Sequence, residues 1–429
     1  MKQASIALAI ALLATACGGG DSGDDGEFIS LGEDGGVASD LPADGLGGVG
    51  GASDGAGGAP EGEGGAPGGM GGAPEGMGGA PEPEPMGLPV LGDGLHTLDA
   101  VQIDEIGNAA VDGLATPRDL AFHPENPGQL WVVNLDDSSM TIFFGVGTDA
   151  QGSRKKFGFG NTHFMAKPSS LAFGQPGFLA TAQEEDQPTQ PTTPDDFMGP
   201  SLWTSDPAVF EAGHASHMDM LHNSPNSAGI AWAGYGNAYW VFDGFHASLS
   251  LYDFHGDHGL GGADHSDGTM QRYVAGEVGY VQGVPSHLAV DGDRLYVADT
   301  GNNRVAVLDT TSGRNAGPVF PNYDTATAQQ QQRVTGANLD TLVDGAAVDG
   351  LERPSGLEIA GEILWITDNA TSRIFAFDLE GTLLDWLDLS DEIDAGGLMG
   401  IAVGPAGDLF VCDALGDRIL RIRAKTADE

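Results

Sequence analysis

The sequence has very little cysteine and very little positive charge. Cys17 and Cys412 are the only cysteines among 429 residues, and 17 Lys and Arg residues stand against 62 Asp and Glu residues, which gives a net charge of -45. A nucleic-acid-binding protein neutralises phosphates with Lys and Arg, so this composition excludes DNA and RNA as partners. An acidic surface of this kind is suited to cations instead.

Long hydrophobic runs are also lacking. The apolar stretch from Ala4 to Ala16 is too short to cross a bilayer, and it ends in small residues as a cleaved signal does. Its last residues, Ala14-Thr15-Ala16-Cys17, resemble the lipobox of a bacterial lipoprotein signal peptide. The resemblance implies that residues 1–16 are removed and that Cys17 carries a lipid that anchors the protein to a membrane. The alternative is an ordinary signal peptide with a chance cysteine.

The lipobox also bears on location and on disulfides. Glycine rather than aspartate follows Cys17, which favours the outer membrane of the bacterial cell envelope, with the domain either periplasmic or surface-exposed. Lipidation of Cys17 leaves Cys412 without a partner for an intramolecular disulfide. Stability must then come from packing or from bound ions.

Residues 17–95 contain almost only Gly, Ala, Pro, Asp and Glu, with near repeats such as GGAPEGEGGAPGGMGGAP. No Lys or Arg occurs between Lys2 and Arg118. Such a segment has too little apolar surface to offset the entropy lost on ordering, so we expect a disordered tether. A Gly-rich coil of this length spans roughly 50 Å, which is enough to hold a domain clear of a membrane.

Residues 96–429 repeat a short pattern of strand, turn, strand, polar turn and strand. The plainest copies begin at Pro285, Pro354 and Leu398, and weaker copies begin at Pro117, Pro168 and Ser227. Six copies predict an all-β fold, a six-bladed β-propeller, in which radial repetition protects the sheet edges. The last copy has only three strands, so we expect the N-terminal stretch from His96 to Ile106 to supply the fourth strand and close the ring.

The copies resemble the NHL repeat family over most of residues 117–425, and the resemblance implies the fold without deciding the activity. In the last three copies an Asp ends the second strand and an Arg begins the third, five positions later. Each pair is predicted to clamp the turn between those strands. The pairs are Asp299 with Arg304, Asp368 with Arg373, and Asp413 with Arg418.

Eight of the eleven histidines lie between His214 and His287. Turns between second and third strands share one face of a propeller with the connections between blades, and we call this the top face. On this interpretation several histidines and one aspartate of neighbouring blades reach the top face. Neutral imidazoles suit zinc, copper or iron, so we expect a transition-metal site there. The predicted ligands are His163, His217, Asp219, His222, His246 and His287; the alternative is that these are turn and packing residues.

The loop FHGDHGLGGADHSDG, residues 254–268, is predicted to join the third and fourth strands of the third blade on the opposite, bottom face. Its carboxylates and glycines predict a second metal or calcium site, because calcium prefers oxygen ligands in a flexible loop. The candidate ligands are Asp253, Asp257, Asp264 and Asp267. One alternative is a solvated Gly-rich turn. Another is that TMQRYVA is not the fourth strand, in which case the loop histidines would join the top-face cluster.

These features predict an exported, membrane-anchored propeller with a metal site. One hypothesis is a metal-dependent hydrolase or lyase, in which a metal-bound water acts as nucleophile or base. Arg118, which would orient an anionic group, and Asp243 are then the candidate catalytic residues. The other hypothesis is a non-catalytic propeller that binds a small molecule, a peptide or a protein on its top face.

Overall fold

The structure is a computed structural model that describes residues 87–157, 165–186, 198–210, 217–262, 264–320, 322–324 and 330–425. The chain divides into two compact units, Met1–Met77 and Gly78–Glu429, and every described residue belongs to the second. In that part of the chain, no helix has the length and apolar character needed to cross a membrane. The predicted signal peptide, Cys17 and most of the predicted tether lie outside the described residues.

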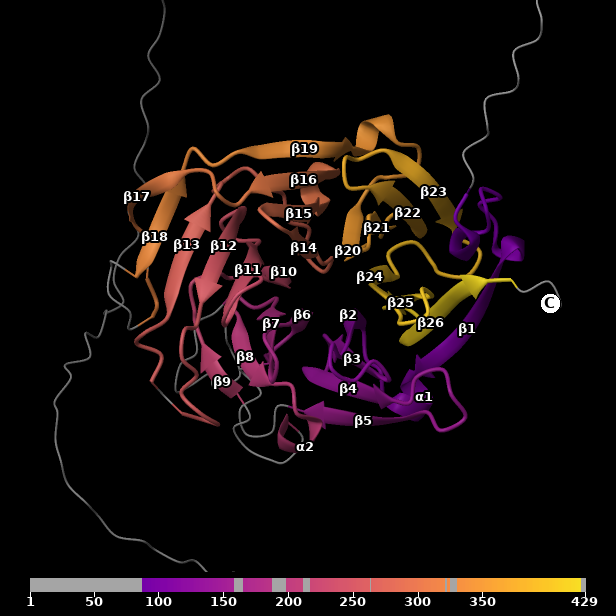
Figure 1. The fold of residues 1–429 in the computed structure, drawn as a ribbon, viewed down its shortest axis with the longest axis horizontal. Coiled ribbons are helices and arrows are strands. Elements are labelled where there is room, and N and C mark those ends of the chain that lie inside the picture. Colours follow the sequence, from indigo (N-terminus) through magenta and orange to yellow (C-terminus); the bar gives the residue numbers. More distant parts are fainter. Residues whose placement is uncertain are drawn as a thin grey trace, which may run out of the picture. The chain divides into compact units, whose positions relative to one another are not determined.

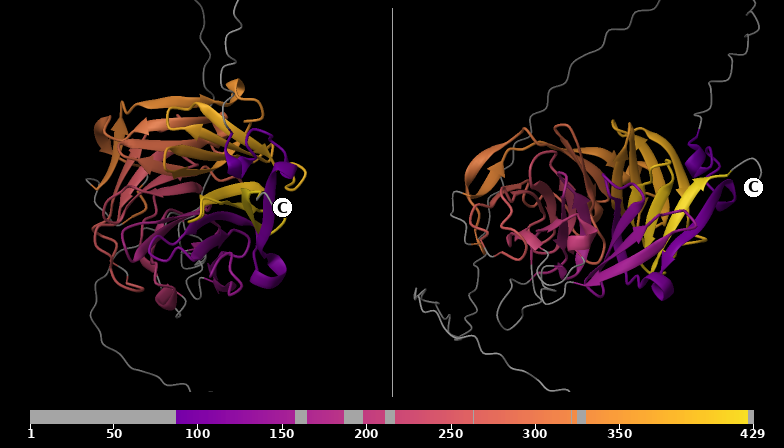
Figure 2. Two further views of the ribbon diagram at one scale, coloured as in Figure 1. Left: turned by 45° about the vertical axis from the view of Figure 1, so that its right-hand side comes forward. Right: turned by 60° about the horizontal axis from the view of Figure 1, so that its bottom comes forward.

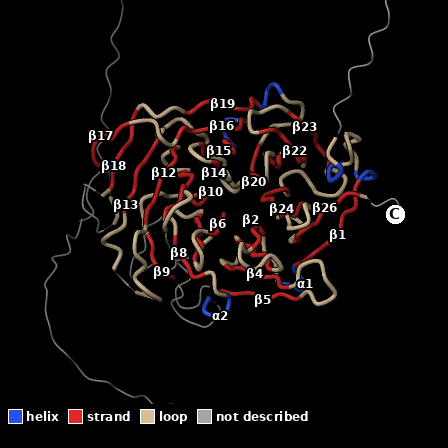
Figure 3. Tube along the Cα trace, viewed as in Figure 1, coloured by secondary structure: helices blue, strands red, loops and turns tan. Residues whose placement is uncertain are grey.

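The described residues form sheets that are arranged as blades, each a meander of strands from the centre outward (Figures 1 and 3). Blade one consists of β2 (Pro117–Phe122), β3 (Gln129–Asn134), β4 (Ser139–Phe144) and β5 (Gly152–Phe157). Blade two consists of β6 (Pro168–Phe173), β7 (Phe178–Gln183), β8 (Ser201–Thr204) and β9 (His217–Met220). Blade three consists of β10 (Ser227–Trp232), β11 (Ala238–Asp243), β12 (Ser248–Asp253) and β13 (Thr269–Tyr273).

The second half of the chain continues the pattern. Blade four consists of β14 (Leu288–Asp291), β15 (Arg294–Asp299), β16 (Arg304–Asp309) and β19 (Leu339–Asp344). Blade five consists of β20 (Pro354–Ala360), β21 (Ile363–Asp368), β22 (Arg373–Asp378) and β23 (Leu383–Asp388). Blade six consists of β24 (Leu398–Val403), β25 (Leu409–Asp413), β26 (Arg418–Ala424) and the N-terminal strand β1 (Val101–Asn108). Short helices, α1 (Ala109–Asp112) and α2 (Pro207–Phe210), lie in connections.

The blades close into a ring. The inner strands contact one another in the cycle β2, β6, β10, β14, β20, β24 and back to β2. Strand β1 pairs antiparallel with β26, from Val101 opposite Ala424 to Asn108 opposite Arg418, and Figure 1 shows the two ends of the described chain side by side there. This confirms the predicted six-bladed propeller, with a closing strand that begins at Val101 rather than at His96.

Hydrophobic residues fill the space between each pair of neighbouring blades. Because side chains alternate along a strand, each sheet can face the preceding blade with one surface and the next blade with the other. In β3, Trp131 and Val133 pack between blades one and two, whereas Val132 packs between blades six and one. Every blade therefore depends on both neighbours for its core.

One element departs from the predicted meander. Strands β17 (Arg314–Pro318) and β18 (Gln331–Thr335) form a hairpin that is inserted between β16 and β19 of blade four. Strand β18 pairs in parallel with β13, the outer strand of blade three, and extends that sheet to six strands (Figures 1 and 2). The hairpin thus covers an edge of blade three that would otherwise lack hydrogen-bond partners.

Two of the three predicted Asp–Arg pairs are present. The Nε atom of Arg304 lies 2.7 Å from Oδ2 of Asp299, and that of Arg418 lies 2.8 Å from Oδ2 of Asp413. In blade five the contacts differ: Nε of Arg373 lies 3.2 Å from Oδ2 of Asp388, while Asp368 accepts a 2.7 Å hydrogen bond from the backbone of Glu352.

Candidate metal centre

The outer strand of blade two carries the first ligand candidates. Strand β9 pairs with β8, with Asp219 opposite Leu202 and His217 opposite Trp203. The register shifts between these two pairs, which marks an irregularity in the strand between His217 and Asp219. Both side chains are buried. The structure therefore places them on a fourth strand, not in the top-face connection in which the sequence analysis placed them.

The loop of residues 254–268 lies against this strand. It joins β12 to β13, as the sequence analysis expected, and so begins and ends on the bottom face. The backbone of His258 donates a hydrogen bond to the carbonyl of Met218, and that of Gly261 donates one to the carbonyl of His217, both at 3.0 Å. The loop of blade three is thus held against the outer strand of blade two.

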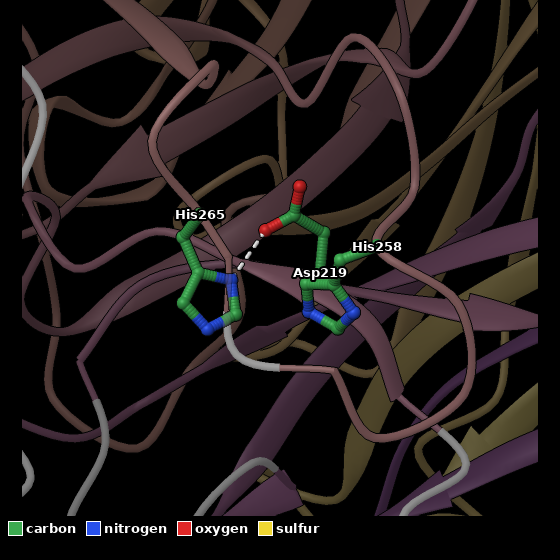
Figure 4. A group of neighbouring side chains, drawn as sticks. All are labelled: Asp219, His258 and His265. Atoms are coloured by element: carbon green, nitrogen blue, oxygen red, sulfur yellow. Dashed lines mark hydrogen bonds and ion pairs between the residues drawn. The ribbon is translucent and has the colours of Figure 1, made fainter. Parts of the chain in front are cut away.

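This contact brings together three side chains that could bind a metal ion, those of Asp219, His258 and His265 (Figure 4). One ligand atom from each lies within 4.8 Å of the others. The Nδ1 atom of His265 lies 2.7 Å from Oδ1 of Asp219, so the carboxylate also orients this ring. Among the residues that the structure describes, this is the one group of three or more such side chains.

Two atoms of the group lack hydrogen-bond partners although they are buried. They are Oδ2 of Asp219 and Nε2 of His258. The Asp219 side chain is 0% exposed, and burial raises the pKa of its carboxyl above the usual range, an effect that the hydrogen bond to His265 opposes. A buried carboxylate oxygen without a partner is costly, and a cation at this position would remove the cost.

A further imidazole lies beside the group. The ring centroid of His217 lies 5.2 Å from that of His258 and 6.5 Å from that of His265. Two imidazoles and a carboxylate form a donor set that suits a divalent transition metal, and His217 is placed to add a third imidazole. The His258 and His265 side chains are half-buried, so the site lies near the surface of the rim.

The four aspartates proposed as calcium ligands do not converge in the structure. Each accepts a hydrogen bond from a backbone N–H of its own loop, as aspartates in turns commonly do. The pairs are Asp253 with His255 at 2.8 Å, Asp257 with Gly259 at 2.9 Å, Asp264 with Ser266 at 3.1 Å, and Asp267 with Gly256 at 3.2 Å.

The other predicted top-face ligands lie apart from one another, each beside a different carboxylate. The Nδ1 atom of His222 lies 2.9 Å from Oδ1 of Asp324, in the segment between β17 and β18. The Nδ1 atom of His246 lies 2.8 Å from Oδ2 of Asp243, and Arg272 reaches the same oxygen at 3.2 Å. Asp243, a candidate catalytic residue, is thus engaged by a histidine and an arginine. His163 lies outside the described residues.

Arg118 and His287 lie at the centre of the ring. The Arg118 side chain is buried, and its Nη2 atom lies 2.6 Å from Oε2 of Glu184. Its Nη1 atom contacts the carbonyl of Gly283 and lies 3.7 Å from Sδ of Met399, so the side chain reaches from blade one toward blades two, four and six. His287 is also buried; its Nδ1 atom lies 3.5 Å from Oδ1 of Asp119, and burial lowers the pKa of its imidazole to about 3.

The arrangement of sheets and the cycle of inner strands define a six-bladed β-propeller. One of its blades also matches the model of a known repeat family. A family model described as NHL repeat matches residues 283–308, which span β14, β15 and most of β16. The chain is therefore a six-bladed propeller whose fourth blade matches the NHL repeat model.

Solved structures with a similar fold include proteins of different activity. A streptogramin B lyase is 11% identical over 76% of this chain and 98% of its own, with a TM-score of 0.45. An auxiliary nutrient binding protein from Bacteroides ovatus is 12% identical over 74% and 70%, with a TM-score of 0.46. Regucalcin, a calcium-binding protein from Agrobacterium tumefaciens, is 13% identical over 75% and 96%, with a TM-score of 0.43. No curated protein matches this chain.

Proposed function

We propose that this protein is a metal-binding propeller. In this proposal, Asp219, His258 and His265 bind one divalent transition-metal ion, which fastens the 254–268 loop of blade three to the outer strand of blade two. The observation that carries the proposal is the fully buried Asp219 carboxylate, whose Oδ2 atom has no hydrogen-bond partner. A buried charge without a partner destabilises a fold strongly. A cation bound to this oxygen would therefore stabilise the protein.

The donor set narrows the choice of metal. Two imidazoles with one carboxylate are typical of zinc sites and of the two-histidine, one-carboxylate iron(II) site. Calcium takes oxygen ligands, which the imidazoles of His258 and His265 cannot supply. Zinc or iron(II) is therefore the metal we propose. Copper, the third metal expected from the histidines, would be detected by the same metal assay.

The test is the metal content of the full-length chain, produced without a histidine tag and without chelator. We expect about one zinc or iron ion per chain, measured by mass spectrometry. Asp219→Ala and His265→Ala should each lower the metal content at least about tenfold. His255→Ala is the matched control, because His255 lies in the same loop, contacts Asp253 and is not part of the group. Equal metal content in all four proteins, or no metal in any, would contradict the proposal.

Catalysis is a second candidate function. Three protein ligands leave a fourth tetrahedral position, where a metal-bound water would act as the nucleophile of a hydrolase or the base of a lyase. The half-buried His258 and His265 allow solvent to approach this position. Hydrolysis of 4-nitrophenyl acetate by the metal-loaded protein tests this hypothesis. Activity that is lost in Asp219→Ala and retained in His255→Ala would support it, whereas activity independent of Asp219 would contradict it.

We also propose that the chain is exported and anchored to the bacterial outer membrane through Cys17. The lipobox-like residues 14–17 and the Gly-rich residues that follow support this proposal. Cys17→Ser should move the protein from the membrane fraction to the soluble fraction. The matched control is Cys412→Ser, because Cys412 is the only other cysteine and is buried in blade six. A Cys17→Ser protein that stays with the membrane would exclude the lipid anchor.

A further inference from the structure

The chain forms a closed loop directly before the strand that completes the ring. Residues 87–100, which we call the clamp, run from the first described residue to the residue before β1. The clamp contains two short 3-10 helices, Pro89–Leu91 and Leu98–Ala100. The first of these helices contacts β23, β26 and β1. The clamp therefore lies against the outer strands of blades five and six (Figure 1).

The backbone of the clamp is folded back on itself. The N–H of Asp93 donates a hydrogen bond to the carbonyl of Leu88 at 3.1 Å. A Cβ atom at Gly87 would lie 2.2 Å from the backbone nitrogen of Gly94, so the start of the clamp packs closely against its middle. The clamp is thus a loop with its own internal contacts and not an extension of β1.

A buried carboxylate of blade five holds this loop. Asp385 lies on β23, where the register shifts beside it, and its side chain is 1% exposed. Its Oδ2 atom accepts hydrogen bonds from the backbone N–H groups of Leu88 at 2.7 Å and Gly94 at 3.2 Å. Hydrogen bonds to an ionised group are stronger than those between neutral groups. Asp385 therefore fixes both the start and the middle of the clamp to β23.

His96 provides a second attachment to the same strand. Its ring stacks on that of Trp386, with 4.1 Å between the centroids and 9° between the planes. The Nδ1 atom of His96 lies 2.7 Å from the carbonyl oxygen of Trp386, and the backbone N–H of Asp388 donates to the carbonyl of His96 at 3.3 Å. These contacts cover part of the edge of β23, the outer strand of its sheet.

The clamp also inserts an apolar side chain between two blades. Leu91 is fully buried in a cluster that includes Leu387 of blade five and Leu420 of blade six. Leu88 and Val90 pack against the same cluster. Removing the clamp would expose this apolar surface to water, which is unfavourable. The clamp is therefore held to the ring by polar and apolar contacts that β1 does not make.

The closing strand itself is paired in a way that a pull on the chain would open. Strand β1 pairs antiparallel with β26, with Val101 opposite Ala424, so both ends of the chain leave the ring at the same end of this pair. The hydrogen bonds of such a pair are perpendicular to the strands, so opposite forces on the two ends would break them one after another. Within the described residues, no disulfide secures the pair.

We propose that the clamp protects this closure by taking up tension that arrives from residues 1–86. A pull on Gly87 is opposed by the contacts that Asp385, His96 and Leu91 make, before any tension reaches Val101. The ring then stays closed while the preceding residues are under load. This role depends neither on a metal ion nor on a lipid at Cys17, because it concerns any load that enters the chain before the clamp.

The test is the lifetime of the closed ring under constant force, measured with optical tweezers on the full-length chain. One handle is attached to the unlipidated thiol of Cys17 and the other to the C-terminus; Cys412 is buried and does not compete for the handle. Opening releases residues 87–108, which lengthens the molecule by roughly 70 Å, since an extended residue spans about 3.3–3.6 Å.

Asp385→Ala should shorten this lifetime at least about tenfold, because it removes two hydrogen bonds to a carboxylate. Asp340→Ala is the matched control, since Asp340 is exposed on β19, the outer strand of blade four. A second handle position distinguishes the proposed role from a general effect on stability. In a Cys17→Ser chain pulled at Asp293→Cys and at the C-terminus, the load does not pass through the clamp, and Asp385→Ala should leave the lifetime unchanged.

Three results would overturn the proposal. Equal lifetimes of the unaltered and Asp385→Ala proteins under load at Cys17 would exclude a clamp at this carboxylate. A lifetime that Asp385→Ala shortens equally at both handle positions would show that Asp385 only stabilises the ring. If Asp385→Ala does not fold, Leu91→Ala decides, because Leu91 lies in the clamp and not in a blade; an unchanged lifetime of that variant under load at Cys17 contradicts the proposal.

Discussion

Replacing Glu358 by glutamine should stabilise the protein above neutral pH. In the folded chain, burial raises the pKa of this carboxyl from 4.5 to about 7. The folded state therefore holds the proton more tightly than the unfolded state, and the free energy of unfolding decreases as the pH rises from about 4.5 to about 7. A shift of this size corresponds to about 3 kcal/mol, since one pKa unit corresponds to about 1.4 kcal/mol. Glutamine keeps the shape of the side chain and cannot ionise.

The assay is urea unfolding of the ligand-free, full-length chain at pH 4, 6 and 8, followed by tryptophan fluorescence. At pH 8 we expect the Glu358→Gln protein to exceed the unaltered protein by up to about 3 kcal/mol in free energy of unfolding, and at pH 4 we expect near equality. Glu362→Gln is the matched control, because Glu362 is exposed in the turn that follows β20. Identical unfolding curves at pH 8 would refute the reasoning.

Three further predictions concern other parts of the ring. His287→Gln should reduce the loss of stability between pH 6.5 and pH 3, because burial lowers the pKa of His287 to about 3; the midpoint of acid unfolding should move to lower pH. Gly229→Ala should lower the melting temperature, since a Cβ there would lie 1.9 Å from the carbonyl oxygen of Ser286, whereas Gly152→Ala, with open space around it, should not. Deletion of residues 1–108 should leave β26 unpaired and cause aggregation, detected by light scattering, that a deletion of residues 1–86 does not cause.

The sequence was sufficient to predict the blades but not the insertion. Apolar residues repeat at short, regular distances in every blade, and the missing fourth strand of blade six indicated that β1 would close the ring. Strands β17 and β18 carry mostly polar residues, and the segment between them is rich in Gln and Thr. No apolar alternation marks such a hairpin, and its parallel pairing with β13 depends on contacts between distant residues.

The candidate metal centre could be predicted only in part, and one short strand explains why. Asp219 was a predicted ligand, and the histidine-rich loop was placed correctly between β12 and β13. The sequence analysis, however, placed Asp219 on the top face and the loop on the bottom face, so it did not bring them together. Strand β9 has four residues, HMDM, which alternate too briefly to be recognised as the outer strand of blade two. Because an outer strand begins on the bottom face, Asp219 lies beside the loop that supplies His258 and His265.

The prediction that the histidines converge did not take into account that carboxylates lie beside several of them. His222 lies beside Asp324, which is more than a hundred positions away in the sequence, within the insertion that was not foreseen. His287 lies beside Asp119 across the ring. Counting histidines in one stretch indicated metal binding, but it could not show which rings are held by other groups.

X-ray absorption at the K edge of the bound metal tests the central claim most directly. For the full-length chain, the account predicts nitrogen and oxygen ligands at about 2.0–2.2 Å, with the outer-shell scattering of at least two imidazoles. His258→Ala should remove one imidazole from that spectrum, and His255→Ala should leave it unchanged. A shell of oxygen atoms alone at about 2.3–2.6 Å, or a spectrum that His258→Ala does not alter, would contradict a metal centre at Asp219, His258 and His265.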